Sequence, residues 1–118
     1  MLFCILLLHT QETKRMRYSL TCYNPDTGEK DYYKADSGSM SNSILYNEDN
    51  EPEITEHSQP VIGECMRVGT YFARTFASQD WWQTTPVEEI LESYEDEESF
   101  NVKFKTRSGS YYHWKEYR

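Results

Sequence analysis

The sequence is poor in the residues that most catalytic and metal-binding sites use. Its 118 residues include only three cysteines and three histidines. Cys4, Cys22 and Cys65 form no Cys-x-x-Cys pair and have no histidine at ligand spacing, which disfavours a zinc site. The histidines have no serine or cysteine partner in a nucleophile motif. We therefore expect reduced cysteines that pack as small apolar residues in a cytoplasmic protein, with no catalytic residue, metal or cofactor.

Long hydrophobic runs are also missing. The longest, Leu2–Leu8, is less than half of the ~20 residues that a membrane-spanning helix needs. Basic residues follow this run instead of preceding it, which argues against a secretory signal. We expect residues 1–16 to be either a leader ahead of an alternative start at Met16 or an extra edge strand over Phe3–Leu8. A chain that starts at Met16 should keep any activity.

Aromatic residues, in contrast, are abundant. They make up 15 % of the chain, and hydrophobic residues as a whole make up 37 %. This composition is too rich in rings for a disordered polar chain, so a packed core is expected. The length leaves room for a single small domain, which we place over residues 17–118.

The first part of this domain has the pattern of a β-hairpin. Tyr18, Leu20 and Cys22 occupy alternate positions, which is the period of a strand with one buried face. The segment 24–28, Asn-Pro-Asp-Thr-Gly, combines a fixed proline φ, an aspartate cap and a glycine, as a chain-reversing turn requires. A returning strand completes the predicted hairpin of residues 17–35.

Residues 36–59 differ in composition, because serine, asparagine and glutamate predominate there. We predict a long acidic loop over this segment, in which Ile44–Tyr46 are compatible with one short strand. A structureless connection of this length is uncommon unless it is functional or mobile.

Two later segments have both helix and strand patterns. Residues 63–77 are rich in β-branched and aromatic residues, which favours a strand. Residues 86–94 begin with Pro86 after a threonine and contain early glutamates, as a capped helix does, although a helix of this length is short of what is stable alone. Both alternatives stay open for each segment on these local signals, and a turn is expected over 77–83.

The last part of the chain shows a second hairpin. Phe100, Val102 and Phe104 alternate with polar residues, and a Ser-Gly turn leads into a strand over 110–117. Together these patterns predict a mainly β fold, or an α+β fold if the ambiguous segments are helices, with a barrel or meander over 60–118.

Three segments of this part, Pro60–Glu64, Trp82–Ile90 and Lys105–Tyr112, resemble small accessory proteins of phages and mobile elements in Gram-positive bacteria. In those proteins, a strand that begins with a Thr-Ser-Pro-Val-like sequence precedes a strand ending in a Thr-x-Ser-x-Tyr-like turn. This chain has Thr85 where serine is usual, and it has an acidic insertion at 95–98. The resemblance covers about half of the chain.

This resemblance implies that residues 84–117 form a three-stranded antiparallel meander, which makes 87–94 a strand. It implies further that the meander closes a small SH3-like barrel with residues 65–76. It also implies a class of function, since such accessory proteins include anti-CRISPR and anti-restriction inhibitors.

Negative charge is concentrated in two blocks of the sequence. Residues 26–64 hold ten acidic and two basic residues, and residues 80–98 hold eight acidic residues and no basic one, so each block has a net charge of -8. Spaced carboxylates can imitate nucleic-acid phosphates and occupy a basic groove. We therefore predict a non-enzymatic inhibitor that binds a host nucleic-acid-handling protein, such as a type II CRISPR nuclease.

The residues assigned to this interface are the exposed acids of both blocks and two adjacent tryptophans. Neighbouring residues of an extended segment face opposite ways, so at least one tryptophan should be partly exposed, and tryptophan is enriched at binding hot spots. The assigned residues are Glu48, Asp49, Glu51, Glu53, Glu88, Glu89, Glu92, Glu95, Asp96, Glu97, Glu98, Trp81 and Trp82.

Three other interpretations remain. The block over 80–98 can be a solvated face whose charge Lys103 and Lys105 balance across the hairpin. The basic and aromatic C-terminal strands can form a small nucleic-acid-binding module, although the net charge of -8 makes direct nucleic-acid binding unfavourable. A metal-dependent nuclease is disfavoured, because the consecutive carboxylates at 95–98 point in different directions on a turn.

Overall fold

The computed structural model describes residues 17–70 and 81–118, and this part of the chain consists of strands and their connections. The strands are β1 (Tyr18–Tyr23), β2 (Lys30–Gly38), β3 (Met40–Tyr46), β4 (Pro52–Ile54), β5 (Cys65–Gly69), β6 (Trp81–Glu95), β7 (Ser99–Thr106) and β8 (Tyr111–Tyr117). The predicted mainly β fold is confirmed. Within these residues no helix could cross a membrane. The predictions for residues 1–16 and 71–80 lie outside the described residues.

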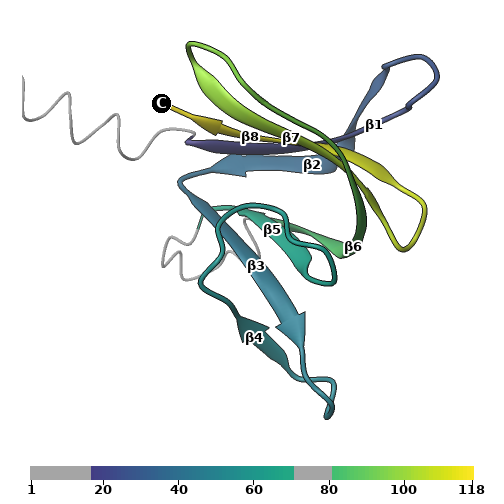
Figure 1. The fold of residues 1–118 in the computed structure, drawn as a ribbon, viewed down its shortest axis with the longest axis vertical. Coiled ribbons are helices and arrows are strands. Elements are labelled where there is room, and N and C mark those ends of the chain that lie inside the picture. The colour runs from purple at the N-terminus through teal and green to yellow at the C-terminus, as the bar shows by residue number, and fades with distance from the viewer. Residues whose placement is uncertain (1–16, 71–80) are drawn as a thin grey trace, which may run out of the picture.

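All eight strands belong to one antiparallel sheet that curls into a half barrel. Their order is β2-β1-β8-β7-β6-β5-β3-β4, and β3 and β4 extend from the half barrel as an arm (Figure 1). The long strand β6 produces the curl, because it pairs first with β5 and then with β7. Pro86 lies where β6 changes partner, and the register of each ladder shifts close to it. A proline has no N–H for a ladder and is confined to bulges and edges.

Strands β6, β7 and β8 form the predicted three-stranded meander. Residues 86–94 are therefore strand and not helix, and β5 makes residues 65–69 a strand as well. The local helix signals of β6 are overridden because residues 87–95 pair with β7 and Pro86 pairs with β5, whereas a helix of that length is marginal. The predicted turn over 77–83 is wrong at its end, since Trp81 already begins β6.

The predicted loop over 36–59 is wrong for most of its length, because the end of β2 and all of β3 and β4 lie within it, and the short strand considered over Ile44–Tyr46 is the end of β3. Its polar composition is misleading. Ser41 and Ser43 are buried in β3, where their hydroxyls donate to the carbonyl oxygens of Ser58 (2.5 Å) and Gln59 (2.9 Å). Satisfied hydroxyls thus occupy positions where a periodicity argument expects apolar side chains.

Strands β1 and β2 form the predicted N-terminal hairpin. Gly28 has the expected positive φ (76°), but the cap is Asn24 instead of the predicted aspartate, since the Asn24 side chain accepts a hydrogen bond from the N–H of Asp26 (2.8 Å). Gly38 has a different role at the end of β2. A Cβ there would collide with the carbonyl group of Gly69, so the close approach of β2 to β5 requires glycine.

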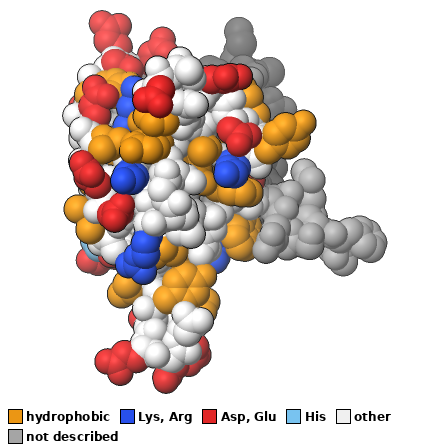
Figure 2. All heavy atoms as spheres, turned by 90° about the vertical axis from the view of Figure 1, so that its right-hand side faces the viewer, with side chains coloured by type: hydrophobic (Ala, Val, Ile, Leu, Met, Phe, Trp, Pro, Cys, Tyr) orange, Lys and Arg blue, Asp and Glu red, His pale blue; other side chains and the backbone are white. Residues whose placement is uncertain are grey.

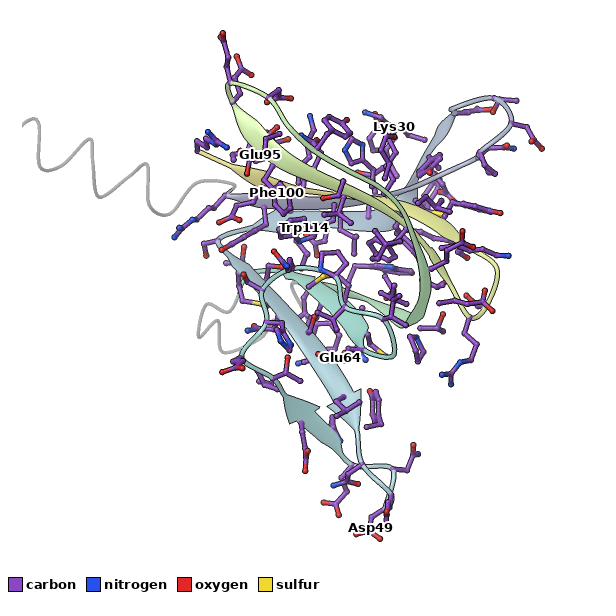
Figure 3. All side chains as sticks on the ribbon, viewed as in Figure 1. Lys30, Asp49, Glu64, Glu95, Phe100 and Trp114 are labelled. Atoms are coloured by element: carbon purple, nitrogen blue, oxygen red, sulfur yellow. The ribbon has the colours of Figure 1, made fainter. Side chains whose placement is uncertain are left out.

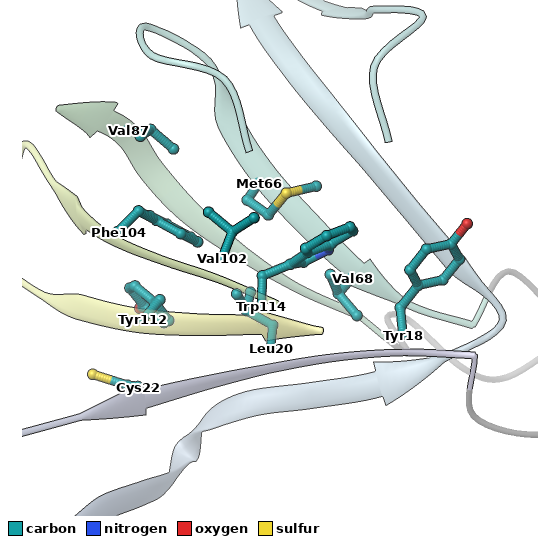
Figure 4. Packing of buried hydrophobic residues seen from close by; sticks show 10 residues of the cluster. All are labelled: Tyr18, Leu20, Cys22, Met66, Val68, Val87, Val102, Phe104, Tyr112 and Trp114. Atoms are coloured by element: carbon teal, nitrogen blue, oxygen red, sulfur yellow. The ribbon is translucent and has the colours of Figure 1, made fainter. Parts of the chain in front are cut away.

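The core lies inside the curl, where side chains of β1, β7 and β8 meet those of β5 and β6 (Figure 4). Trp114 is fully buried, and its ring packs against Tyr18 and Phe100 with centroid separations of 6.0 and 5.9 Å. Its indole Nε1 donates to Ser41 Oγ (2.9 Å), which ties the arm to the core. The alternate residues of β1, β8 and β7 point to the opposite side of these strands, which we call the outer face.

Candidate functional site

Three of the assigned glutamates on β6 form ion pairs within the molecule. Bulges in β6 shift its register against β7, so that Glu92 lies opposite Lys103 and Glu88 lies beside the residue that pairs with Lys105. The pairs are Glu88 with Lys105 (3.8 Å), Glu92 with Lys103 (3.7 Å) and Glu95 with Arg118 (2.6 Å). Each pair is partly exposed and contributes about 0–1 kcal/mol. The charge balance considered from the sequence is thus present, and only Glu89 on this strand has no ion pair among the described residues.

The turn between β6 and β7, residues 96–98, is held together by Asp96. Its Oδ1 accepts hydrogen bonds from the N–H of Glu98 (2.9 Å), the N–H of Ser99 (2.7 Å) and the Ser99 hydroxyl (3.1 Å). The backbone bonds from Glu98 and Ser99 lower the pKa of Asp96. Asp96 therefore fixes the turn, whereas Glu97 and Glu98 are exposed and have no ion-pair partner in the described residues.

The turn between β3 and β4, residues 47–51, has the same construction. The side-chain oxygen of Asn47 accepts hydrogen bonds from the N–H groups of Asp49 and Glu51, both at 2.9 Å. Asn47 also donates through Nδ2 to Glu53 (3.3 Å). The side chains of Glu48, Asp49 and Glu51 are exposed, and the described residues supply no cation to them. We call residues 47–51 the arm turn and residues 96–98 the β6–β7 turn.

The two acidic turns lie at opposite ends of the molecule. Figure 3 shows Asp49 at the tip of the arm and Glu95 at the far end of the half barrel. Carboxylates gather at the tip of the arm and again around the upper part of the face seen in Figure 2, with lysine, arginine and apolar side chains between them. The longest dimension of the molecule is 50 Å. The predicted acidic residues therefore form two separate clusters and not one surface.

The paired tryptophans face opposite ways, as predicted for an extended segment. Trp82 packs against the core, and its Nε1 donates to the hydroxyl of Tyr112 (3.1 Å). Trp81 lies on the other side of the strand, with the guanidinium of Arg67 4.0 Å from its ring centroid. Arg67 also donates to Gln83 Oε1 through Nε (2.9 Å) and Nη2 (2.6 Å). Trp82 thus has a structural position, and Trp81 is covered on one face by Arg67.

The outer face carries lysines placed over tyrosine rings. The basic C-terminal strands were noted in the sequence, but Tyr23 and Lys30 of the N-terminal hairpin, which lie beside them, were not. The only sequence signal for Tyr23 is its position on β1, which alternates with the core residues. The stacked pairs are Lys103 with Tyr23 (5.7 Å), Lys105 with Tyr111 (5.9 Å) and Lys115 with Tyr117 (5.6 Å).

His113 lies among these lysines on β8. Its Nε2 is 2.8 Å from Asn101 Oδ1, and the Asn101 Nδ2 donates elsewhere, so Nε2 carries the proton in this bond. Burial, and then the charges of Lys103, Lys115 and Lys30, lower the pKa of His113 to about 4. The imidazole is therefore neutral at neutral pH.

Among the described residues, no three His, Cys, Asp or Glu side chains are arranged to hold a metal ion. Cys22 and Cys65 are buried free thiols, and burial raises the pKa of each.

Comparisons of this chain with protein-family models, with curated proteins and with solved structures found no match. The resemblance to phage accessory proteins therefore stays a prediction, and function has to be argued from the site.

Proposed function

We propose that this protein is a non-enzymatic inhibitor whose acidic turns imitate phosphates and occupy the basic groove of a host nucleic-acid-handling protein in the bacterial cytoplasm. A type II CRISPR nuclease is the target that we select. The observation that carries the proposal is that both turns have a backbone fixed by a side-chain cap and present carboxylates that form no ion pair with any residue of 17–70 or 81–118. Asn47 provides the cap in the arm turn, and Asp96 provides it in the β6–β7 turn.

A fixed turn favours this kind of binding for an energetic reason. Ordering a loop and its side chains on association reduces affinity, so carboxylates that already sit on a rigid hairpin bind at lower cost. Their charge also steers a basic partner during diffusion, which raises the association rate most at low ionic strength. The 50 Å length of the molecule is about that of fifteen base pairs, so two acidic ends can reach separate parts of one groove.

The structure reduces the set of residues that we propose for contact. Glu88, Glu92 and Glu95 neutralise lysines and an arginine of the same molecule, and Asp96 is required for its turn. Trp82 belongs to the core. The contact residues that we propose are Glu48, Asp49 and Glu51 of the arm turn, and Glu97 and Glu98 of the β6–β7 turn.

The experiment is a DNA cleavage assay with a purified type II CRISPR nuclease, in which the protein is added before or after the guide RNA. We expect the protein to inhibit cleavage when it is added before the guide RNA. We expect cleavage to continue when the guide RNA is added first and already fills the groove. Full cleavage in both orders, at molar excess of the protein, would contradict this target. A pull-down from host lysate tests the wider proposal, because partners of a phosphate mimic should elute with the polyanion heparin.

A further inference from the structure

The outer face contains a hollow that the acidic turns do not use. It lies between β2, β1 and β8 and has a volume of about 330 Å³. This is near the lower end of the range of small-molecule sites, about 300–1,000 Å³. Figure 3 shows Lys30, one of its lining residues, on the opposite side of the strands from the core residue Trp114.

Positive charge predominates in the hollow although the chain as a whole is acidic. Lys30 from β2 and Lys115 from β8 line it, together with one carboxylate, Asp36. The lowered pKa of His113, which also lines the hollow, agrees with this local charge, since both of these lysines disfavour its protonation. The hydroxyls of Ser19 and Thr21 add hydrogen-bonding groups on the floor of β1.

Aromatic rings border the same hollow. Tyr32 is 73 % exposed and lines it from β2, so one face of this ring is available for stacking. Tyr117 lines it from β8, with Lys115 over its ring. Exposed rings next to lysines are the combination that binds a nucleobase and its phosphate, because the ring stacks on the base while the ammonium groups bind the anion.

We propose that this hollow binds a nucleoside monophosphate, with Lys30 and Lys115 on the phosphate and Tyr32 stacked on the base. The overall charge of -8 selects a small ligand over a long strand. A polyanion would meet the repulsion of both acidic ends, whereas a mononucleotide interacts mainly with groups within a Debye length of about 8 Å. This site is independent of the phosphate mimicry proposed above.

The experiment is a titration of the full chain with AMP, followed through the ring resonances of His113 in NMR spectra. We expect saturable shifts of these resonances, and weaker binding of adenosine and of inorganic phosphate than of AMP. Lys30→Gln, Lys115→Gln and Tyr32→Ala should each raise the Kd about tenfold, which is the size of one stacking or charge contact. Lys34→Gln is the matched control, because it removes the same charge from an exposed position of β2 outside the hollow.

Three results would overturn the proposal. The first is the absence of a saturable His113 shift with AMP in a protein whose circular dichroism spectrum is that of a folded β protein. The second is an equal loss of affinity in Lys34→Gln, since binding would then depend on net charge and not on the hollow. The third is tighter binding of a single-stranded oligonucleotide than of AMP through the same lysines, because the ligand would then be a strand.

Discussion

At the scale of single residues, His113 is the side chain whose chemistry the fold alters most. It is half-buried on the outer face, bonded to Asn101 and surrounded by Lys30, Lys103 and Lys115. Burial and like charge act in the same direction, and they lower its pKa from 6.5 to about 4. Nothing in the local sequence distinguishes this histidine, because the lysines that act on it come from three different strands.

This pKa predicts a specific pH dependence of stability. The unfolded chain has the ordinary histidine pKa of 6.5, so between pH 6.5 and about 4 it binds a proton that the native state does not bind. The free energy of unfolding should therefore fall as the pH falls through this window. In His113→Gln, which keeps a donor for Asn101, the fall should be shallower. Urea denaturation at several pH values measures it, and parallel profiles for the two proteins would contradict the burial of a neutral imidazole.

At the scale of the elements, β3 shows how a polar strand is held in a sheet. Its buried hydroxyls are bonded to the segment that follows β4, and Ser41 also accepts the indole N–H of Trp114. The arm is thus attached to the half barrel by hydrogen bonds in addition to apolar packing. Such bonds are costly to break, because a buried donor is left without a partner.

The substitution Ser41→Ala tests this attachment. It removes the acceptor of the Trp114 indole N–H in a fully buried position, so we expect a loss of about 1–3 kcal/mol in the free energy of unfolding. Ser93→Ala, on an exposed position of β6, is the control and should change stability little. Equal denaturation midpoints for the two variants would show that β3 does not depend on this bond.

The same elements explain what the sequence could and could not predict. Both hairpins were predictable, since Tyr18, Leu20 and Cys22 alternate cleanly and the turn residues are diagnostic. β3 was predictable only at its end, Ile44–Tyr46, because Ser41 and Ser43 are buried with satisfied hydroxyls. Strand β6 needed tertiary information, since its local signals favour a helix and its pairing with β5 and then with β7 decides the outcome.

The candidate site shows a similar division. The acidic residues could be found by counting charge, but their roles depend on register. The bulges of β6 decide that Glu92 faces Lys103, and apart from Pro86 beside the first bulge no sequence pattern marks them. The capping role of Asp96 likewise depends on the folded turn, which brings the N–H groups of Glu98 and Ser99 within hydrogen-bond distance of its carboxylate.

At the scale of the whole molecule, the fold places the arm turn and the β6–β7 turn at opposite ends, with lysines and aromatic rings between them. The arm carries the arm turn away from the half barrel, and the meander carries the β6–β7 turn to the other end (Figures 1 and 3). The carboxylates of these two capped turns form no ion pair with the described residues, so their negative potential can steer a basic partner. The ion-paired glutamates of β6 are much less suited to this, because the neighbouring lysines and arginine partly cancel their negative potential.

The most direct measurement is the association rate with the type II CRISPR nuclease free of guide RNA, determined by surface plasmon resonance at low and at moderate salt. Removing the turn charges in Glu97→Gln/Glu98→Gln, or in Glu48→Gln/Asp49→Asn/Glu51→Gln, should slow association at low salt, and the difference from the parent should shrink as salt screens it. Glu29→Gln/Glu56→Gln is the matched control, because it also removes two exposed charges, at positions outside both acidic turns, and should associate nearly as fast as the parent. If both acidic-turn variants associate at the same rate as the parent, the turns are not phosphate mimics. The same conclusion follows if the control is slowed as much as the acidic-turn variants.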